Sequence, residues 1–334
     1  MPSALETGLT TQGISYERNG CIQSTLLTSR ADMVIHPNSP EQVEALLPML
    51  MEANMPYHIL GGGSNSLLTG TDKAPLQTVI IDTGRLKKVK VNGETGDVTA
   101  EAGVKIATVS RVSAQSQLSG LEFACGVPGS TAGAVVTDAW HPIHNYGDEF
   151  EVRKIDHTQI PKHMRTVLTG VDVIGSDGVI REMTTAELGM QNRSSIFLEP
   201  GNTLFLLRAK FHLTPGDQSL IEEVRDVVCL GRANMRKANK AKNKHSVGKT
   251  LGYTFVLNHP DYKGKSAMQL ITESHSLPQF VSEKGMMHSK NTPNIVCNTG
   301  NGNPEGYLRI IENIQDAVRR DHGIEMPVEV RIIS

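Results

Sequence analysis

The chain has 334 residues, enough for about two domains, and 38% of them are hydrophobic. Its formal net charge of −2 does not indicate a nucleic acid or a membrane as a partner. No run of about 18 apolar residues occurs, and the first thirty residues lack the charged start and apolar stretch of a leader peptide. We therefore expect a soluble, cytoplasmic protein. We also predict that it is a monomer or weak dimer and acts on a small molecule.

The spacing of the cysteines argues against a cysteine-ligated metal site. The chain has four of them, far apart in sequence and without metal-type spacing: Cys21, Cys125, Cys229 and Cys297. We expect reduced thiols and no bound metal.

The first third of the chain alternates strand and helix patterns. Ser39-Pro40 is a helix N-cap followed by proline at the first helical position, and apolar residues recur at helical spacing as far as Asn54. Residues 31–83 are therefore predicted to form strand, helix, strand, loop and strand. A further strand over 98–102 and a helix over 106–118 follow.

Three adjacent glycines, Gly61 to Gly63, follow the apolar run 57–60 and precede Ser64 and Asn65. Glycine permits positive φ and close backbone approach, so successive N–H groups can converge on one anion, usually a phosphate. The alternative is a tight surface turn between two strands.

A second glycine-rich segment covers residues 126–134 and also contains Pro128. Its few side chains indicate a surface on which a flat ligand or another backbone segment lies close. A loop packed on a helix is the alternative interpretation.

The rest of the chain continues the mixed pattern. Residues 171–180 predict a hairpin, 203–213 a strand and 219–238 a helix, which runs into the basic stretch 236–245. Such a stretch is usually a solvated face, and otherwise attracts phosphates.

The end of the chain has clear boundary signals. Asn303-Pro304 begins a helix that Gly323 ends. A final strand over 328–332 is predicted to carry Glu329 and Arg331 on one face.

Two motifs are decoys. The sequence 246–250 imitates the end of a P-loop, but Asn243 stands where that motif needs glycine, so we reject an ATPase or kinase. His141 and His144 have a metal-compatible spacing, but no carboxylate or cysteine completes a site, and solvated loop histidines are expected.

Together these segments resemble the UDP-N-acetylenolpyruvoylglucosamine reductase (MurB) family of flavoproteins. Residues 60–65 are similar to that family's flavin-phosphate segment, and 118–134 to its second flavin segment. Arg193-Ser194-Ser195 stands where the family has Tyr-Arg-x-Ser. Residues 285–298 and the ending 327–333 match its last two motifs in order.

The chain also departs from that pattern. Asn192 replaces the tyrosine before the catalytic arginine, and Asp138-Ala139-Trp140 replaces Asn-Ala-Gly. Gly252-Tyr253-Thr254-Phe255 stands where the family has Gly-Ser-x-Phe, so Tyr253 replaces the proton-donating serine.

The resemblance implies an α+β fold: a two-lobed FAD-binding region of the vanillyl-alcohol-oxidase/MurB type and a third, substrate-binding α+β domain. The implied boundaries are 1–215 for the FAD-binding region, with its lobes split near 84–90, and 216–326 for the substrate-binding domain. Residues 327–334 would form a strand that returns to the FAD-binding region.

The implied activity is reduction of the enolpyruvyl ether of UDP-N-acetylglucosamine, a step of peptidoglycan precursor synthesis, with FAD as cofactor and NADPH as reductant. Arg193 would hold the enolpyruvyl carboxylate and stabilise the developing charge, and Glu329 would lie across the substrate as the second member of that pair. Tyr253 would donate the proton. Asn258 and Ser289 would bind substrate. The implied FAD-binding residues are Gly61, Gly62, Gly63, Ser64, Asn65, Gly126, Pro128, Gly129, Ser130, Gly133 and Ala134.

Tyr253 leaves two questions open. A phenol is a stronger acid than an alcohol but far larger than serine, so Thr254 or Thr250 are alternative donors. The chain could also be a flavin enzyme of this fold acting on a different small substrate in a specialised biosynthetic pathway, or a flavin- or nucleotide-binding protein without catalysis.

Overall fold

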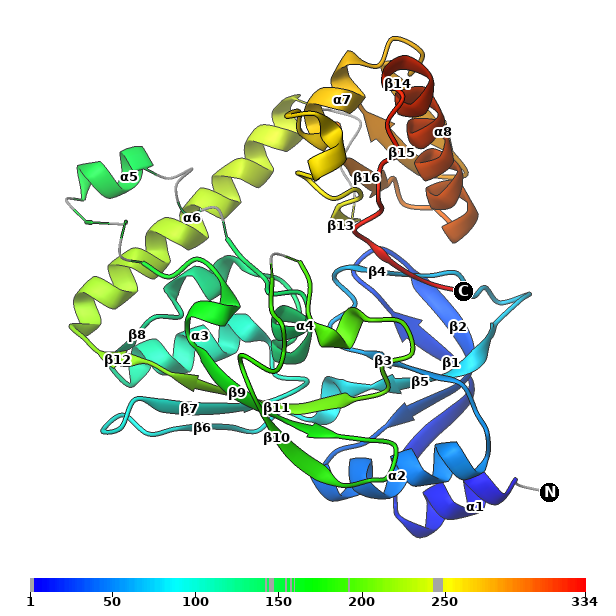
Figure 1. The fold of residues 1–334 in the computed structure, drawn as a ribbon, viewed down its shortest axis with the longest axis vertical. Coiled ribbons are helices and arrows are strands. Elements are labelled where there is room, and N and C mark those ends of the chain that lie inside the picture. Colours follow the sequence, from blue (N-terminus) through cyan, green and yellow to red (C-terminus); the bar gives the residue numbers. More distant parts are fainter. Residues whose placement is uncertain are drawn as a thin grey trace. The chain divides into compact units, whose positions relative to one another are not determined.

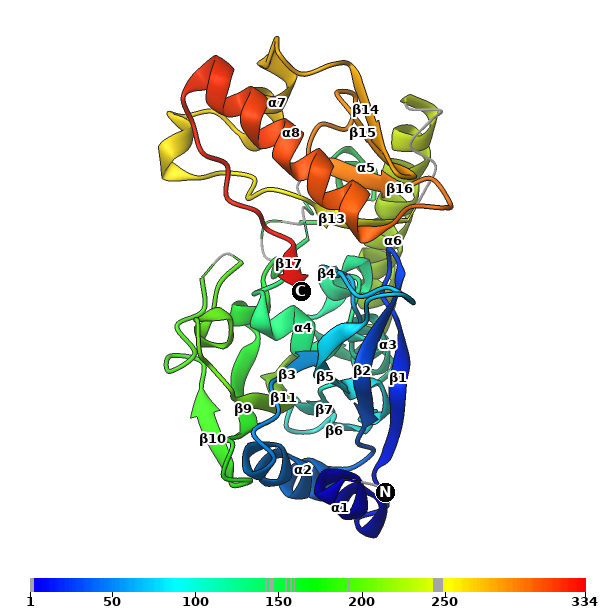
Figure 2. The same ribbon diagram turned by 90° about the vertical axis from the view of Figure 1, so that its right-hand side faces the viewer.

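The computed structural model (Figures 1 and 2) describes residues 3–141, 143, 147–153, 155–156, 158, 160–191, 193–242 and 249–334. The backbone forms two compact units, each built from separate stretches of chain. Unit 1 comprises residues 1–18, 33–62 and 78–234, and unit 2 comprises 19–32, 63–77 and 235–334. The domain boundaries implied by the resemblance stay a prediction. No helix in the described ranges is long and apolar enough to cross a bilayer.

A five-stranded antiparallel sheet lies at the centre of unit 1, in the order β10-β9-β11-β7-β6. Its strands are β6 (Val89–Val91), β7 (Asp97–Glu101), β9 (Leu168–Ile174), β10 (Ile180–Thr184) and β11 (Phe205–His212). The predicted hairpin is confirmed, because Ile174 pairs with Ile180 across a turn in which Gly178 has a φ of +74°.

Helices α3 (Ile106–Gln115) and α4 (Thr131–Val136) pack against this sheet, as Figure 1 shows. Val109, Val135 and the inward residues of β7 and β11 belong to one hydrophobic core. Helix α3 ends three residues before the predicted limit at Leu118, which instead lies in the short strand β8 (Leu118–Ser119). This packing fixes the second glycine-rich segment, since that segment leads into α4.

A second sheet has the order β1-β2-β5-β3. Its strands are β1 (Ser15–Gln23), β2 (Thr28–His36), β3 (Tyr57–Leu60) and β5 (Leu76–Asp82). Strands β3 and β5 pair in parallel from Tyr57↔Val79 to Leu60↔Asp82. The first glycine segment therefore begins directly after the last paired residue of β3. Helix α2 (Pro40–Glu52) begins as predicted, with the Ser39 hydroxyl accepting the Gln42 N–H at 3.4 Å.

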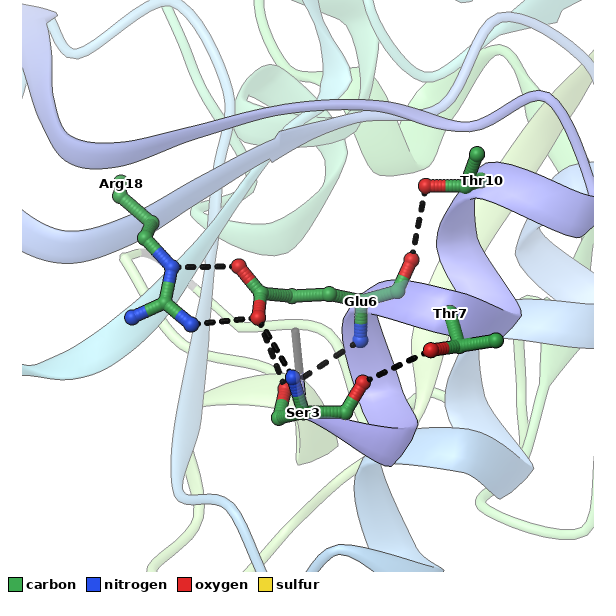
Figure 3. Close-up of polar contacts among 5 residues, drawn as sticks. All are labelled: Ser3, Glu6, Thr7, Thr10 and Arg18. Carbon is green, nitrogen blue, oxygen red and sulfur yellow. Dashed lines mark hydrogen bonds and ion pairs between the residues drawn. The ribbon is translucent and has the colours of Figure 1, made fainter. Parts of the chain in front are cut away.

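The N-terminal helix α1 (Ala4–Thr11) was not predicted, and Figure 3 shows why it is stable. The Ser3 hydroxyl accepts the Glu6 N–H at 3.3 Å, while the Glu6 carboxylate accepts the Ser3 N–H at 2.7 Å, a reciprocal capping box. Arg18 of β1 forms an ion pair with the same carboxylate. This pairing lowers the Glu6 pKa to about 2, so the carboxylate stays charged at neutral pH.

The remaining elements of unit 1 are short connections and most of one long helix, whose residues from Met235 onward belong to unit 2. They are η1 (Thr83–Arg85), η2 (Glu122–Gly126), α5 (Gly147–Val152), η5 (Met164–Thr166), η6 (Ile196–Leu198), β12 (Thr214–Pro215) and α6 (Gln218–Lys242). Helix α6 confirms the helix predicted over 219–238 and extends into the first part of the basic stretch. Residues 243–245 of that stretch lie outside the described residues.

Unit 2 has its own sheet and core. An antiparallel sheet in the order β13-β16-β15-β14 packs against α8. The elements are β4 (Ser66–Leu68), β13 (Lys249–Tyr253), η7 (Pro260–Tyr262), α7 (Ala267–Glu273), β14 (Phe280–Glu283), β15 (Met286–Ser289), β16 (Ile295–Asn298), α8 (Pro304–His322) and β17 (Arg331–Ile333). Tyr262, Tyr307 and Ile310 are among the fully buried residues of its core.

The end of the chain matches the prediction for the helix and departs from it for the strand. Helix α8 has the predicted caps, with Asn303 accepting the Gly306 N–H at 2.9 Å and Gly323 at a φ of +66°. The predicted final strand over 328–332 is confirmed in part: strand β17 covers Arg331–Ile333, begins later than predicted and pairs in parallel with β4. Ile332 is exposed and Ile333 buried, so the expected alternation fails beyond Val330.

Candidate functional site

The two glycine-rich segments lie against each other in unit 1. A Cβ on Gly62 would stand 2.8 Å from the Gly129 Cα, and one on Gly61 would overlap the Ser130 hydroxyl. The Gly62 N–H donates to Ser130 Oγ at 3.3 Å. The glycine at 62 is therefore required by the close approach of two backbones, whatever binds beside them.

Ser130 is the link between these segments. It is the N-cap of α4, and its Oγ also accepts the Gly133 N–H at 3.2 Å. Gly129 has a φ of +102°, which favours glycine, and its carbonyl accepts the Ile106 N–H at 3.2 Å. The predicted residues from Gly126 to Ala134 thus form one ordered segment whose backbone is held by α3 and α4.

Exposure separates the members of this segment. Pro128 is exposed and Gly129 and Gly133 are half-buried, whereas Gly126 and Ala134 are buried. Gly126 packs against the His141 ring, because a Cβ there would lie 2.7 Å from two ring atoms.

The second half of the first glycine segment is anchored within unit 2. Gly63 has a φ of +58° and its carbonyl accepts the Thr25 N–H at 3.0 Å. The half-buried Ser64 follows it. The Asn65 carbonyl accepts the Arg331 N–H at 3.0 Å, and its Nδ2 donates to the Glu329 carbonyl at 3.3 Å.

Asn65 also offers a test of whether these residues fit a cofactor. Its Oδ1 is buried and has no hydrogen-bond partner among the described residues. Leaving a buried acceptor without a donor typically costs about 1–3 kcal/mol, so such an atom points to a donor supplied by a ligand. This orphaned oxygen fits a bound group that donates a hydrogen bond.

Arg193 lies in a strained turn of unit 1. Gln191 and Ser194 exchange backbone hydrogen bonds at 3.0 and 2.9 Å, and Arg193 lies between them in the chain. Arg193 has a φ of +61°, a left-handed conformation that costs a non-glycine residue of order 1–3 kcal/mol. The next serine, Ser195, is buried and donates to the Val136 carbonyl at 2.7 Å.

Strain of this kind persists where the surroundings require the residue, often at functional sites. Since six other described non-glycine residues also have positive φ, the catalytic role of Arg193 stays a prediction. Asn192, the departure beside it, lies outside the described residues.

Tyr253 and Glu329 come together within unit 2. Burial, and secondarily the negative charge of Glu329, raise the Tyr253 pKa above its ordinary value. The phenol is protonated at neutral pH and is a weaker acid than an exposed tyrosine. The Glu329 backbone N–H donates to the Thr254 carbonyl at 2.8 Å, which holds the stretch before β17 beside the end of β13.

The two alternative hydroxyls are differently placed. Thr254 is fully buried, and its hydroxyl is 3.2 Å from the Tyr307 hydroxyl inside the unit 2 core. The Thr250 hydroxyl accepts the Gly252 N–H at 3.1 Å and so stabilises a local turn. The half-buried Tyr253 has neither constraint.

The two predicted substrate-binding residues differ in exposure. Asn258 is exposed, whereas Ser289 is 1% exposed and its hydroxyl accepts the Asn291 N–H at 3.2 Å. Arg193 belongs to unit 1, while Tyr253, Glu329, Asn258 and Ser289 belong to unit 2. That these residues act on one substrate stays a prediction.

One expectation about histidine was wrong. His141 is 7% exposed rather than solvated, and burial, with the nearby Arg232 charge, lowers its pKa to about 4. Its ring is therefore neutral at pH 7. His144 lies outside the described residues, as do 246–248 of the P-loop decoy. Lys249 and Thr250 of the decoy pair with Asn298 and Cys297 in a sheet, an arrangement unlike a P-loop.

Sequence reasoning noted Asp138 only as a departure and missed its partner. Its carboxylate is fully buried, forms an ion pair with Arg165 and accepts the Arg165 N–H at 3.0 Å. The replacement of asparagine by aspartate thus comes with a compensating cation. The 27 positions between the two residues leave no local signal of this contact.

Comparison with known proteins places these features in a family. A model described as an FAD binding domain matches residues 31–148. A second, described as UDP-N-acetylenolpyruvoylglucosamine reductase, C-terminal domain, matches residues 188–333. The UDP-N-acetylenolpyruvoylglucosamine reductase of Clostridium perfringens is 30% identical over 304 residues, which are 91% of this chain and 87% of that protein. That of Carboxydothermus hydrogenoformans is 28% identical, covering 91% and 88% respectively.

A solved structure shares the fold. The crystal structure of the Thermus caldophilus UDP-N-acetylenolpyruvylglucosamine reductase matches with a TM-score of 0.63 and 21% identity, covering 96% of this chain and 99% of that one. The predicted α+β fold of the MurB type, with an FAD-binding region, is confirmed. Since a relative at 30% identity is matched over most of its length, the chain belongs to the UDP-N-acetylenolpyruvoylglucosamine reductase family.

Proposed function

We propose that this protein is an FAD-dependent oxidoreductase that uses NADPH to reduce the enolpyruvyl ether of UDP-N-acetylglucosamine during peptidoglycan precursor synthesis. Membership of the family, at 30% identity over 91% of the chain, is the observation that carries this proposal. The predicted cofactor, FAD, agrees with the FAD binding domain matched over residues 31–148. We keep the cytoplasm as the predicted place of action and a monomer or weak dimer as the predicted state, with no nucleic acid or membrane partner.

The two glycine segments supply the chemistry for holding FAD. Ser130 Oγ accepts the Gly62 and Gly133 N–H groups and so fixes the shape of these segments, and the buried Asn65 Oδ1 accepts a donor from the ligand. Backbone N–H groups suit a pyrophosphate, and the side-chain-poor stretch around Gly129 suits a flat ring. When bound, FAD carries a hydride from NADPH to the enolpyruvyl group.

The chain's own side chains then manage charge and protons. The Arg193 guanidinium holds the substrate carboxylate and stabilises the negative charge that develops there. The Tyr253 phenol, protonated at neutral pH, donates a proton to the carbon beside the one that receives hydride. Glu329 lies across the substrate from Arg193, and Asn258 and Ser289 bind other parts of the substrate.

Tyr253 also favours a second candidate, a reductase of the same fold acting on a different small substrate. A phenol takes space that a serine leaves open, so the pocket can be reshaped. The specific observation is that Tyr253 is half-buried beside Glu329.

One experiment distinguishes the two candidate functions. The purified protein should be yellow, release FAD on denaturation, and oxidise NADPH faster when UDP-N-acetylglucosamine enolpyruvate is added. Bound FAD with NADPH oxidation that this substrate does not stimulate would favour the second candidate. Colourless protein that takes up no added FAD would overturn both.

A further inference from the structure

Two cysteines that lie far apart in sequence meet in unit 1. Cys125 is in η2 and Cys229 is in α6, 104 positions later, and their sulfur atoms are 2.9 Å apart. Both are free thiols, with Cys229 exposed and Cys125 half-buried. A separation this short places two thiols where a bond between them needs only a small movement.

The surroundings make the two sulfurs unequal. The Cys125 thiol lies 3.4 Å from the Arg225 carbonyl, and Arg232 donates to the carbonyl of the adjacent Gly126. The hydrogen bond between the two sulfurs, together with the Arg225 and Arg232 charges, lowers the Cys229 pKa to about 7, against the opposing effects of burial and Asp226.

The partner sulfur has the opposite tendency. Its hydrogen bond to Cys229 and its burial raise the Cys125 pKa. Near neutral pH about half of the Cys229 side chains are therefore thiolate, the nucleophilic form. Cys125 remains a protonated thiol beside the Cys229 sulfur.

We propose that Cys125 and Cys229 form a reversible redox pair that a small-molecule disulfide closes and a dithiol reopens. The exposed Cys229 thiolate attacks one sulfur of the small disulfide, forms a mixed disulfide and releases one thiolate. Cys125 then loses its proton and attacks the Cys229 sulfur, which releases the second small thiol. Two protein thiols are oxidised to one disulfide while one small disulfide is reduced to two thiols.

The other two cysteines do not share this arrangement. Cys297 is 4% exposed, and burial raises its pKa to about 11, which makes its thiol a poor nucleophile. Cys21 is exposed on β1 and belongs to unit 2, outside the unit that holds the pair. Substitution of Cys21 therefore provides a matched control.

The pair borders the second glycine segment. Gly126 follows Cys125 directly, and Gly129 packs against Gly62. Closing the disulfide fixes this segment to helix α6, so the oxidised protein should be more stable than the reduced one. Because the bond closes a loop of about a hundred residues, we expect a melting temperature higher by roughly 5 °C or more.

The test uses the reduced holoprotein, treated with oxidised glutathione at pH 7 after removal of dithiol. Remaining thiols are capped with N-ethylmaleimide in denaturant and counted by intact mass, and the link is located by peptide mapping. We expect the four capped thiols of the reduced protein to fall to two, with no retained glutathione and with residues 125 and 229 joined. Dithiothreitol should restore four.

Variants check the order of events. Cys125→Ser should trap glutathione on Cys229, because the resolving sulfur is gone. Cys229→Ser should react with oxidised glutathione at least tenfold more slowly at unit 1, whereas Cys21→Ser should still form the link at the wild-type rate.

Three outcomes would overturn the proposal: four capped thiols after treatment, a stable glutathione adduct at Cys229 in the wild type, or a link between other cysteines. An oxidised protein that melts no higher than the reduced one would overturn the inference that the bond joins α6 to η2 in their folded positions.

Discussion

Gly62→Ala tests the contact between the two glycine segments. The added Cβ would lie 2.8 Å from the Gly129 Cα and 3.1 Å from the Ser130 nitrogen, where ordinary contacts begin at 3.4 Å. Both neighbours are backbone atoms, so they cannot move aside as the end of a side chain can. The segments must separate by about 0.6 Å or distort, and overpacking of this kind costs about 1–3 kcal/mol.

This cost gives two measurable effects. The melting temperature should fall by roughly 2–12 °C, from the usual 2–4 °C per kcal/mol for a domain of this size. If FAD binds the closed arrangement, its dissociation constant should rise by the same free energy, about 5- to 150-fold. Thermal unfolding followed by circular dichroism measures the melting temperature, and titration of the apoprotein with FAD followed by flavin fluorescence measures the dissociation constant.

Gly147→Ala is the matched control. Gly147 begins helix α5, and a Cβ there has no neighbour within 4 Å. Alanine at such a position is expected to be neutral or slightly stabilising. If Gly62→Ala unfolds and binds FAD as Gly147→Ala does, the close approach of the two glycine segments is refuted.

Four other predictions concern single side chains. Arg193→Gly keeps a residue able to adopt a φ of +61°, so it should change the free energy of unfolding by less than about 1 kcal/mol. It should slow flavin reoxidation by substrate ~10²–10³-fold and leave flavin reduction by NADPH unaffected. Stopped-flow absorbance separates the two half-reactions, and equal losses in both would contradict the catalytic role. Tyr253→Phe should block proton delivery to product and Tyr253→Ser should restore part of the rate, whereas an unchanged rate in the phenylalanine variant excludes the phenol as donor. Thr254→Val should cost about 1–3 kcal/mol by leaving the Tyr307 hydroxyl unpaired, without slowing turnover. Burial lowers the pKa values of His141 and His288 to about 4 in the folded protein, below the value of about 6.5 in the unfolded chain. As the pH falls from 6.5 to 4 the unfolded chain therefore takes up these protons first, and the free energy of unfolding should fall by at most about 3 kcal/mol for each histidine. A free energy of unfolding that stays constant across that range would show that the two rings are not buried in their neutral form.

Local signals predicted local structure well. Ser39 and Pro40 begin α2, and Asn303 and Gly323 bound α8, because caps depend on residues only a few positions away. The hairpin β9–β10 follows from the glycine of its turn. The sheet of unit 2 was not predicted, since four-residue strands such as β14 are too short to show a period.

Sequence motifs identified the residues of the candidate site but not their contacts. Motif order indicated Arg193, Tyr253 and Glu329, but no sequence pattern says that Thr254 is buried or that Arg193 has a positive φ. The contact of Cys125 with Cys229 depends on the packing of η2 against α6, which spacing cannot reveal. The sequence predicted a solvated His141, because the packing of its ring against Gly126 depends on the fold and leaves no signal in the sequence.

The pairing of β17 with β4 sets a constraint on how the chain is made. Asn65 and Glu329, which bond beside this pair, are 264 positions apart. At about 5–20 residues per second, a ribosome needs roughly 15–50 s to travel between them. During that time β4 has an open edge, and the Asn65 side chain lacks the carbonyl that fixes it. We expect nascent chains halted before residue 329 to show the first glycine segment sensitive to protease, and longer chains to protect it.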